Sequence, residues 1–178
     1  MIMQSESLIG LTAAIVGCGR MGQIHSKALN SLNINITLLL DPIEENRSQL
    51  ISNLCQENIP LEFNSVDNIK MDNLPDLFII ATTADFHCEI AIKLIQLGVK
   101  YILLEKPLAR SIRECYLIRE VAKKHKSRIA VNHQMRFMPL YIEPKLNFNK
   151  EEFGGFTSMT VNAGNFGLAM CGSHYFEA

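Results

Sequence analysis

The sequence predicts an α/β fold, in which a doubly wound parallel sheet is followed by the beginning of an α+β open-sheet domain. Three observations support this prediction. Short apolar runs alternate with stretches of helical periodicity, which is the pattern of linked β-α-β units. A glycine-rich turn joins the first apolar run to the first helix. After Pro139 the pattern changes, and residues 156–163 alternate apolar and polar side chains. We therefore expect a first domain over residues 1–135 and an incomplete second domain over residues 136–178.

Six apolar runs are expected to form the strands of the first domain. The first is β-branched at its centre and stops at Gly17, and the second ends at Asp41-Pro42, where proline disfavours a longer strand. Their nearly continuous apolar character is typical of strands that are covered on both faces. The pattern is least developed in the third run. The expected strands are residues 12–17, 36–40, 61–63, 77–81, 101–104 and 128–131.

Helices are expected between these strands. Phe86, Ile90 and Leu94 follow one another at helical spacing, so we expect them to form one buried face of a helix that ends at Gly98. The last helix before the sixth strand is rich in basic residues, which are spread around it and read as a solvated face. The expected helices are residues 21–32, a segment from about 44, residues 86–98 and residues 111–126.

The second domain is expected to begin with a helix from Pro139 to about Asn149. The segment 156–163 then alternates apolar and polar residues, which is typical of an antiparallel sheet with one covered face. Few residues follow this strand, so most of its sheet is missing from the chain. We therefore expect the chain to be truncated or a piece of a longer protein.

Composition excludes several classes of function. The chain has 178 residues with 17 Lys+Arg and 18 Asp+Glu, and it lacks the basic stripe of a nucleic-acid-binding protein. Its five cysteines lie far apart in the sequence, so no zinc site is expected and the thiols are predicted to be reduced and mostly buried. No secretory leader or membrane span is recognisable. We expect a cytoplasmic protein with a small-molecule partner, no nucleic acid, no membrane and no bound metal.

The glycine-rich turn matches the dinucleotide fingerprint GxGxxG between a strand and a helix. Gly17 permits the tight turn, Gly19 lets the backbone approach a pyrophosphate, and Gly22 lets the helix pack closely on the strand. Arg20 and Met21 lie in the same turn and are expected to contact the cofactor as well. The alternative is that the glycines serve only the strand-to-helix turn.

Asp41 follows the second strand, where a carboxylate can accept hydrogen bonds from the adenosine ribose and repel a 2′-phosphate. NAD is therefore the expected cofactor. Arg47 lies close by in the sequence, so NADP stays open as an alternative. An ordinary aspartate beside a helix is the simpler explanation of Asp41.

Two later segments also follow strands at the edge of the sheet where ligands bind. Glu105 and Lys106 follow the fifth strand, and a desolvated Lys106 ammonium can hydrogen-bond a substrate hydroxyl and take part in acid-base chemistry. Thr82, Thr83 and His87 follow the fourth strand. These three residues are expected to contact the cofactor, as are Glu105 and Lys106. The alternatives are a solvated lysine at a strand end and, for His87, a half-buried helix residue.

These motifs resemble the glucose-fructose oxidoreductase / inositol dehydrogenase (Gfo/Idh/MocA) family of NAD(P)-dependent oxidoreductases. The resemblance runs from about Ala13 to the last residue. Five segments carry it in the family's order: AIVGCGRMGQIH at 14–25, ATTADFH at 81–87, LEKPLA at 104–109, RFMP at 136–139 and GSHYFE at 172–177.

The resemblance implies a Rossmann domain followed by a substrate and oligomerisation domain. It implies that Lys106 and His174 act on a substrate hydroxyl while hydride passes to the nicotinamide. Met170 and Glu177 stand where the family usually has two aspartates around that histidine, and the chain is about half the usual length. These departures put the activity of the chain in doubt.

Two functions from different classes follow. The first is an oxidoreductase that transfers hydride between a sugar, polyol or nucleotide sugar and NAD(P), inactive if the chain is truncated. The second is a non-catalytic NAD-binding module that docks on a partner protein. A homo-oligomer formed through the second domain is expected in the first case.

Overall fold

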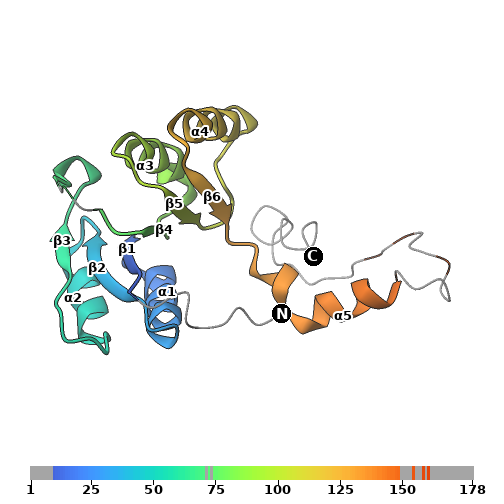
Figure 1. The fold of residues 1–178 in the computed structure, drawn as a ribbon, viewed down its shortest axis with the longest axis horizontal. Coiled ribbons are helices and arrows are strands. Elements are labelled where there is room, and N and C mark those ends of the chain that lie inside the picture. Colours follow the sequence, from blue (N-terminus) through green and yellow to red (C-terminus); the bar gives the residue numbers. More distant parts are fainter. Residues whose placement is uncertain are drawn as a thin grey trace. The chain divides into compact units, whose positions relative to one another are not determined.

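The structure, a computed structural model, describes residues 10–70, 72, 74–148, 154, 158 and 160. The chain divides into two compact units, one up to Val131 and one from Asn132. The first unit contains a sheet with helices, and the described part of the second contains two helices (Figure 1).

The first unit is built on a six-stranded parallel sheet with the order β3-β2-β1-β4-β5-β6. Strands β1, β2 and β3 are added toward one edge of the sheet, and β4, β5 and β6 are added toward the other edge. The direction in which strands are added therefore reverses between β1 and β4. The strands are β1 Thr12–Val16, β2 Asn35–Leu40, β3 Leu61–Phe63, β4 Leu77–Ile80, β5 Tyr101–Leu104 and β6 Arg128–Val131. The predicted parallel sheet is confirmed, with strand ends within one residue of those expected.

Helices cover both faces of this sheet (Figure 1). They are α1 Arg20–Ser31, α2 Glu44–Ser52, α3 Ala84–Gln96 and α4 Ile112–His125, with a 3-10 helix, η2, at Val66–Asn68. Ser111 caps α4 by accepting a hydrogen bond from the Glu114 amide at 3.2 Å. Gly98 has a φ of 98° just after α3, which confirms its expected place at the end of that helix.

Successive strand residues point into two separate cores because side chains alternate across a sheet. Ala14 and Val16 of β1 belong to the core beneath α3 and α4. Ala13 and Ile15 belong to the opposite core, which also contains residues of α1 and α2. Both faces of the central strands are therefore buried, which explains why these strands read as continuous apolar runs.

One expected core residue is placed differently. Phe86 is 55% exposed, whereas the buried face of α3 consists of His87, Ala91, Leu94 and Ile95. Phe86 lies in the first turn of α3, just beyond the carboxyl end of β4. The prediction that Phe86 faces the core is therefore wrong.

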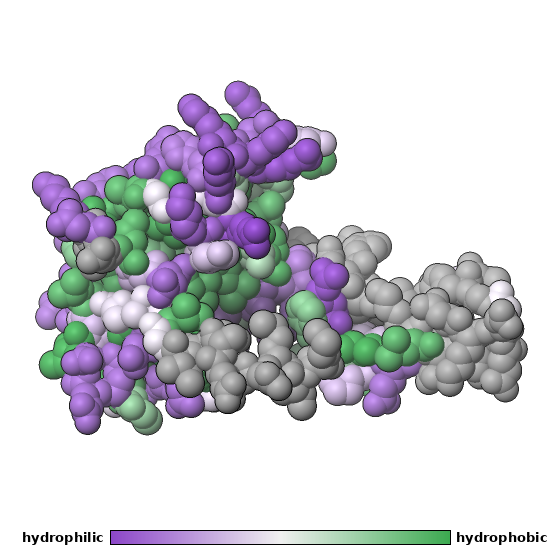
Figure 2. All heavy atoms as spheres, in the orientation of Figure 1, coloured by the Kyte–Doolittle hydropathy of each residue, from purple (hydrophilic) through white to green (hydrophobic). Residues whose placement is uncertain are grey.

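Hydrophilic side chains gather at the top of the view in Figure 2, where Figure 1 places α4, although Ile112, Tyr116 and Leu117 of this helix are also exposed. Arg113, Arg119, Lys123 and Lys124 are all exposed. The solvated-face interpretation of the basic helix is confirmed.

The described part of the second unit contains the 3-10 helix η3, Gln134–Phe137, and α5, Pro139–Phe148. This confirms the helix expected after Pro139. The strand expected at 156–163 falls mostly outside the described residues, and the two described positions in it, Ser158 and Thr160, belong to no strand. No helix in the described part of the chain is both long and apolar enough to cross a membrane.

Candidate functional site

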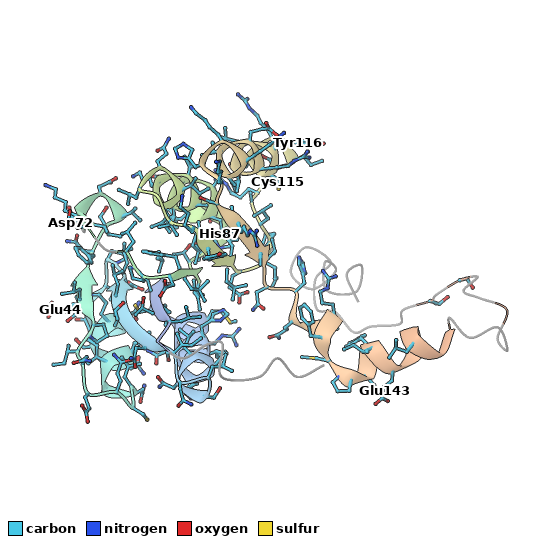
Figure 3. All side chains as sticks on the ribbon, viewed as in Figure 1. Glu44, Asp72, His87, Cys115, Tyr116 and Glu143 are labelled. Carbon is cyan, nitrogen blue, oxygen red and sulfur yellow. The ribbon has the colours of Figure 1, made fainter. Side chains whose placement is uncertain are left out.

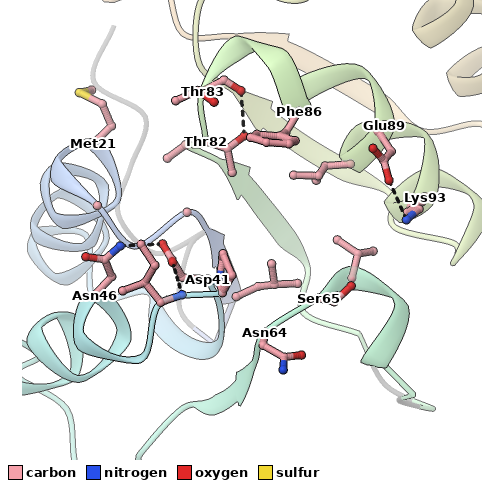
Figure 4. Close-up of a pocket in the computed structure, with 18 of the residues that line it drawn as sticks. Met21, Asp41, Asn46, Asn64, Ser65, Thr82, Thr83, Phe86, Glu89 and Lys93 are labelled. Carbon is pink, nitrogen blue, oxygen red and sulfur yellow. Dashed lines mark hydrogen bonds and ion pairs between the residues drawn. The ribbon is translucent and has the colours of Figure 1, made fainter.

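A cavity of about 660 Å³ opens at the carboxyl edge of the sheet, where the strand order changes direction (Figure 4). Its volume falls within the usual range for small-molecule sites, and its position is the one that open α/β sheets use for ligands. Residues from the ends of β1, β2 and β4 and from the starts of α1 and α3 line it. The predicted site residues among them are Gly17, Gly19, Arg20, Met21, Asp41, Thr82 and Thr83.

The three fingerprint glycines meet different surroundings. Gly17 has a φ of 91°, and a Cβ there would lie 2.8 Å from the carbonyl carbon of Ala81. A Cβ on Gly22 would overlap the carbonyl oxygen of Gly17, so α1 packs this close only because Gly22 has no side chain. A Cβ on Gly19 would meet nothing within 4 Å, although Gly19 lines the cavity. Gly17 and Gly22 therefore serve the fold, whereas Gly19 keeps the cavity open.

The amino end of α1 faces the same cavity. Arg20 and Met21, its first residues, line the cavity, and Gly19 at the N-cap position has no side chain to satisfy their amides. Its first turn contains no acidic residue. The free N–H groups and the positive end of the helix dipole suit an anionic group such as a pyrophosphate.

Asp41 is held at the cavity wall by its neighbours. Its Oδ2 accepts a hydrogen bond from the Cys18 amide at 2.7 Å, and its Oδ1 accepts one from the Ile43 amide at 2.8 Å. The Asn46 side-chain amide donates a third, weaker bond at 3.3 Å. An ionised carboxylate has about four acceptor positions, so capacity remains for a hydroxyl of a bound ligand.

Arg47 does not line the cavity. Its Nε donates to Glu62 Oε2 at 2.9 Å, and its Nη1 donates to the main-chain oxygen of Asp41. Its side chain is only 13% exposed. Arg47 was the reason to keep NADP as an alternative cofactor, but its guanidinium is hydrogen-bonded to Glu62 and Asp41.

Glu105 and Lys106 follow β5, and neither of these two expected cofactor contacts lines the cavity. Glu105 is buried, and its Oε1 lies 2.8 Å from Nε2 of His25 on α1. Lys106 is half-buried beside this pair. Sequence reasoning missed the contact between His25 and Glu105, because periodicity and motif spacing do not pair residues that are 80 positions apart.

His87 is placed differently from the other expected cofactor contacts. It is 1% exposed and absent from the cavity lining, and Figure 3 shows it among the elements of the α3 side. Its Nδ1 lies 2.8 Å from the Pro107 carbonyl oxygen and its Nε2 lies 3.0 Å from that of Thr82. These contacts favour the alternative of a helix residue, although His87 is fully buried and not half-buried. Its ring joins the segment after β4 to the segment after β5.

Two further expectations concern the rest of the chain. His174, the second residue of the expected catalytic pair, lies outside the described residues. Within the described ranges, no three His, Cys, Asp or Glu side chains gather so as to hold a metal ion.

The described thiols differ more in burial than expected: Cys18 is buried, Cys88 and Cys115 are half-buried, and Cys55 is exposed. Cys55 follows α2 in a loop, where no helix covers it. The prediction of mostly buried thiols is therefore wrong for the described cysteines. Burial, together with the negative charge of Asp41, raises the pKa of Cys18 from 9.0 to about 12.

Alkylation should separate these thiols. At pH 8, iodoacetamide is expected to modify Cys55 readily and Cys18 hardly at all, because the thiolate is the reactive form and Cys18 holds its proton. Peptide mass spectrometry over time measures both rates in one sample, and a urea-unfolded sample serves as the control in which the rates should converge. Equal rates in the folded protein would contradict the burial of Cys18.

Comparison with known proteins bears on the same region. A family model described as "Oxidoreductase family, NAD-binding Rossmann fold" matches residues 11–133. The chain is 30% identical over 126 residues to the rhizopine catabolism protein MocA of Rhizobium meliloti, covering 70% of this chain and 38% of that protein. It is 29% identical over 145 residues to the scyllo-inositol 2-dehydrogenase (NAD(+)) of Bacillus subtilis (strain 168), covering 79% and 41%.

A solved structure shares the fold. The WlbA dehydrogenase from Chromobacterium violaceum, in complex with NADH and UDP-GlcNAcA, has a TM-score of 0.72 and 21% identity over 81% of this chain and 41% of that one. The chain spans 38% and 41% of the length of the two curated relatives. The predicted Rossmann fold is confirmed, and the family's description confirms NAD as the predicted cofactor.

Proposed function

Since the chain belongs to the Gfo/Idh/MocA family of oxidoreductases, with its NAD-binding Rossmann fold, we propose that it holds NAD in the cavity beside β1 and β2. We propose further that it belongs to a dehydrogenase that acts on a hydroxyl-bearing sugar, polyol or nucleotide sugar. The observation that carries the proposal is the convergence of Gly17, Gly19 and Asp41 on one cavity with the amino end of α1.

The lining of the cavity fits the adenosine half of a dinucleotide. The N–H groups at the start of α1 suit the pyrophosphate, and the Asp41 carboxylate suits the adenosine ribose. Ile43 and Phe86 line the same cavity and are 51% and 55% exposed, so two large apolar side chains are available for the adenine ring. Exposure of large apolar side chains to water is unfavourable, and an adenine ring stacked on them would bury them.

Lys106 is the proposed acid-base residue for the substrate, together with His174. NAD supplies the hydride acceptor at its nicotinamide ring. Lys106 follows β5, at the same edge of the sheet as the cavity but outside its lining, which suits contact with a substrate hydroxyl more than with the adenosine half. A lysine that accepts the hydroxyl proton leaves the oxygen electrons free to form the carbonyl as hydride departs.

The domain boundary and assembly follow from the same proposal. Residues 1–135 form the dinucleotide-binding domain, and residues 136–178 begin the substrate and oligomerisation domain, through which a homo-oligomer forms. The cytoplasmic location predicted from the sequence stays a prediction.

The test is cofactor binding followed by turnover. NADH is titrated into the chain and followed by nicotinamide fluorescence, and the chain is then incubated with NAD and a panel of sugars, inositols and nucleotide sugars while NADH absorbance is recorded. Binding with turnover supports the dehydrogenase. Binding without turnover on any substrate, by a chain extended to full family length as well, favours the alternative, a non-catalytic NAD-binding module that docks on a partner. Absence of binding contradicts both.

Asp41→Ala should weaken the binding of NAD by about 1 to 3 kcal/mol, the scale of lost hydrogen bonds to a charged group. It should also reduce any preference of the chain for NAD over NADP. The same change leaves the buried Cys18 amide without its acceptor, so the free energy of unfolding should also fall. Titration of both cofactors and urea unfolding measure the two effects. Tighter binding of NADP than NAD by the unaltered chain would contradict the role of Asp41.

A further inference from the structure

Behind the cavity wall formed by Asp41 lies an ion pair between Arg47 of α2 and Glu62 of β3. Arg47 Nε donates to Glu62 Oε2 at 2.9 Å, while Nη1 donates to the main-chain oxygen of Asp41. The two side chains are 13% and 37% exposed. The guanidinium is therefore fixed to the backbone of the residue whose carboxylate lines the cavity, without lining the cavity itself.

The location of Arg47 bears on the choice between the two nicotinamide cofactors, NAD and NADP. NADP differs from NAD by a phosphate on the 2′-hydroxyl of the adenosine ribose, and dinucleotide sites accept this phosphate with an arginine near the end of the second strand. The planar fork of a guanidinium matches phosphate oxygens. Arg47 thus has the residue type and the location of a phosphate ligand, but Glu62 neutralises it and occupies its Nε.

The other cations near the cavity do not offer the same ligand for a 2′-phosphate. Among the described residues that line the cavity, the cations are Arg20 and Lys93. Lys93 Nζ lies 2.9 Å from carboxylate oxygens of both Asp67 and Glu89, so its charge is already compensated. Arg20 is the first residue of α1, on the side of the cavity proposed for the pyrophosphate. Arg47 differs from both because it is hydrogen-bonded to Asp41 itself.

We infer that Glu62 is a specificity-determining residue of the cofactor site. By holding the Arg47 guanidinium outside the cavity, Glu62 withholds from a 2′-phosphate the cation that would bind it. The preference for NAD over NADP then depends on Glu62 as well as on Asp41. The inference rests on the proposed function, because it requires that the adenosine ribose binds beside Asp41.

The experiment compares dissociation constants of NADH and NADPH for the unaltered chain and for Glu62→Gln, by nicotinamide fluorescence. Glu62→Gln is expected to shift the ratio of the two constants toward NADPH by about tenfold or more, the scale of one hydrogen bond to a charged group. Arg47→Gln combined with Glu62→Gln should abolish the shift, because the released guanidinium is then missing. Glu44→Gln, which removes one exposed carboxylate at the start of α2, should shift the ratio by less than about threefold.

The outcomes separate the inference from the proposed function. An unchanged ratio in Glu62→Gln, or a shift that persists without Arg47, overturns the inference while NADH binding by the unaltered chain still supports the cofactor site. If the unaltered chain binds neither cofactor, the proposed function fails and the inference fails with it. Circular dichroism confirms folding of each variant, and Glu62→Ala repeats the test if Glu62→Gln unfolds.

Discussion

Replacing Gly19 with valine is expected to abolish NAD binding by a chain that stays folded. Gly19 has extended backbone dihedrals, with φ of −69°, and a Cβ there meets no protein atom within 4 Å, so valine is tolerated by the fold. The branched side chain instead projects into the space where the pyrophosphate approaches the amino end of α1. Loss of two charge-assisted hydrogen bonds weakens binding by about 100-fold or more.

The other two fingerprint glycines provide matched controls for Gly19→Val. Gly22→Ala and Gly17→Ala place a Cβ against backbone atoms, so both should lower the free energy of unfolding before cofactor binding is considered. Urea unfolding and nicotinamide fluorescence, measured on the same three variants, distinguish the two effects. A folded Gly19→Val that binds NADH as tightly as the unaltered chain would mean that the pyrophosphate does not approach Gly19.

In a chain extended to full family length, Lys106→Ala is expected to lower turnover by roughly 100-fold or more, the scale for loss of a positioned acid-base group. The affinity for NAD should change little, because Lys106 does not line the cavity that holds Gly19 and Asp41. The measurement is the ratio of kcat for variant and unaltered protein on whichever substrate of the panel is turned over, alongside NADH titration.

Two lysine variants sharpen this test. Lys106→Arg keeps the positive charge but removes a group that can release its proton, so it should also lose turnover. Lys100→Ala removes an exposed lysine just before β5 and should leave both kcat and NADH affinity unchanged. Near-normal kcat in Lys106→Ala would remove Lys106 from the proposed mechanism.

Most of the first unit could be predicted from the sequence, because its signals are local. Strands that are buried on both faces read as apolar runs, and the strand-to-helix turn requires glycine at Gly17 and Gly22 for steric reasons. The error at Phe86 has a physical cause. Helical periodicity shows which residues share a face, but it does not show where along the helix the covering sheet ends.

Contacts between segments that are distant in the chain could not be predicted from the sequence. The pair His25 and Glu105, and the carbonyl contacts of His87, join elements that meet only because of the strand order. The position of Arg47 is a similar case. The sequence shows Arg47 only as a cation six positions after Asp41. Its partner, Glu62, lies on β3, so the ion pair can be recognised only when the pairing of β2 with β3 is known.

The hydrogen bonds around Asp41 also have a consequence for the thermodynamics of binding. The amides of Cys18 and Ile43 fix both carboxylate oxygens in the absence of any ligand. The conformational entropy of this side chain is thus lost when the chain folds, and a ribose does not have to immobilise it. Ordering a flexible side chain on association costs affinity, and this cost does not arise at Asp41 because folding has already fixed its carboxylate. Preorganisation of this kind lowers the entropic penalty of binding without adding any contact to the ligand.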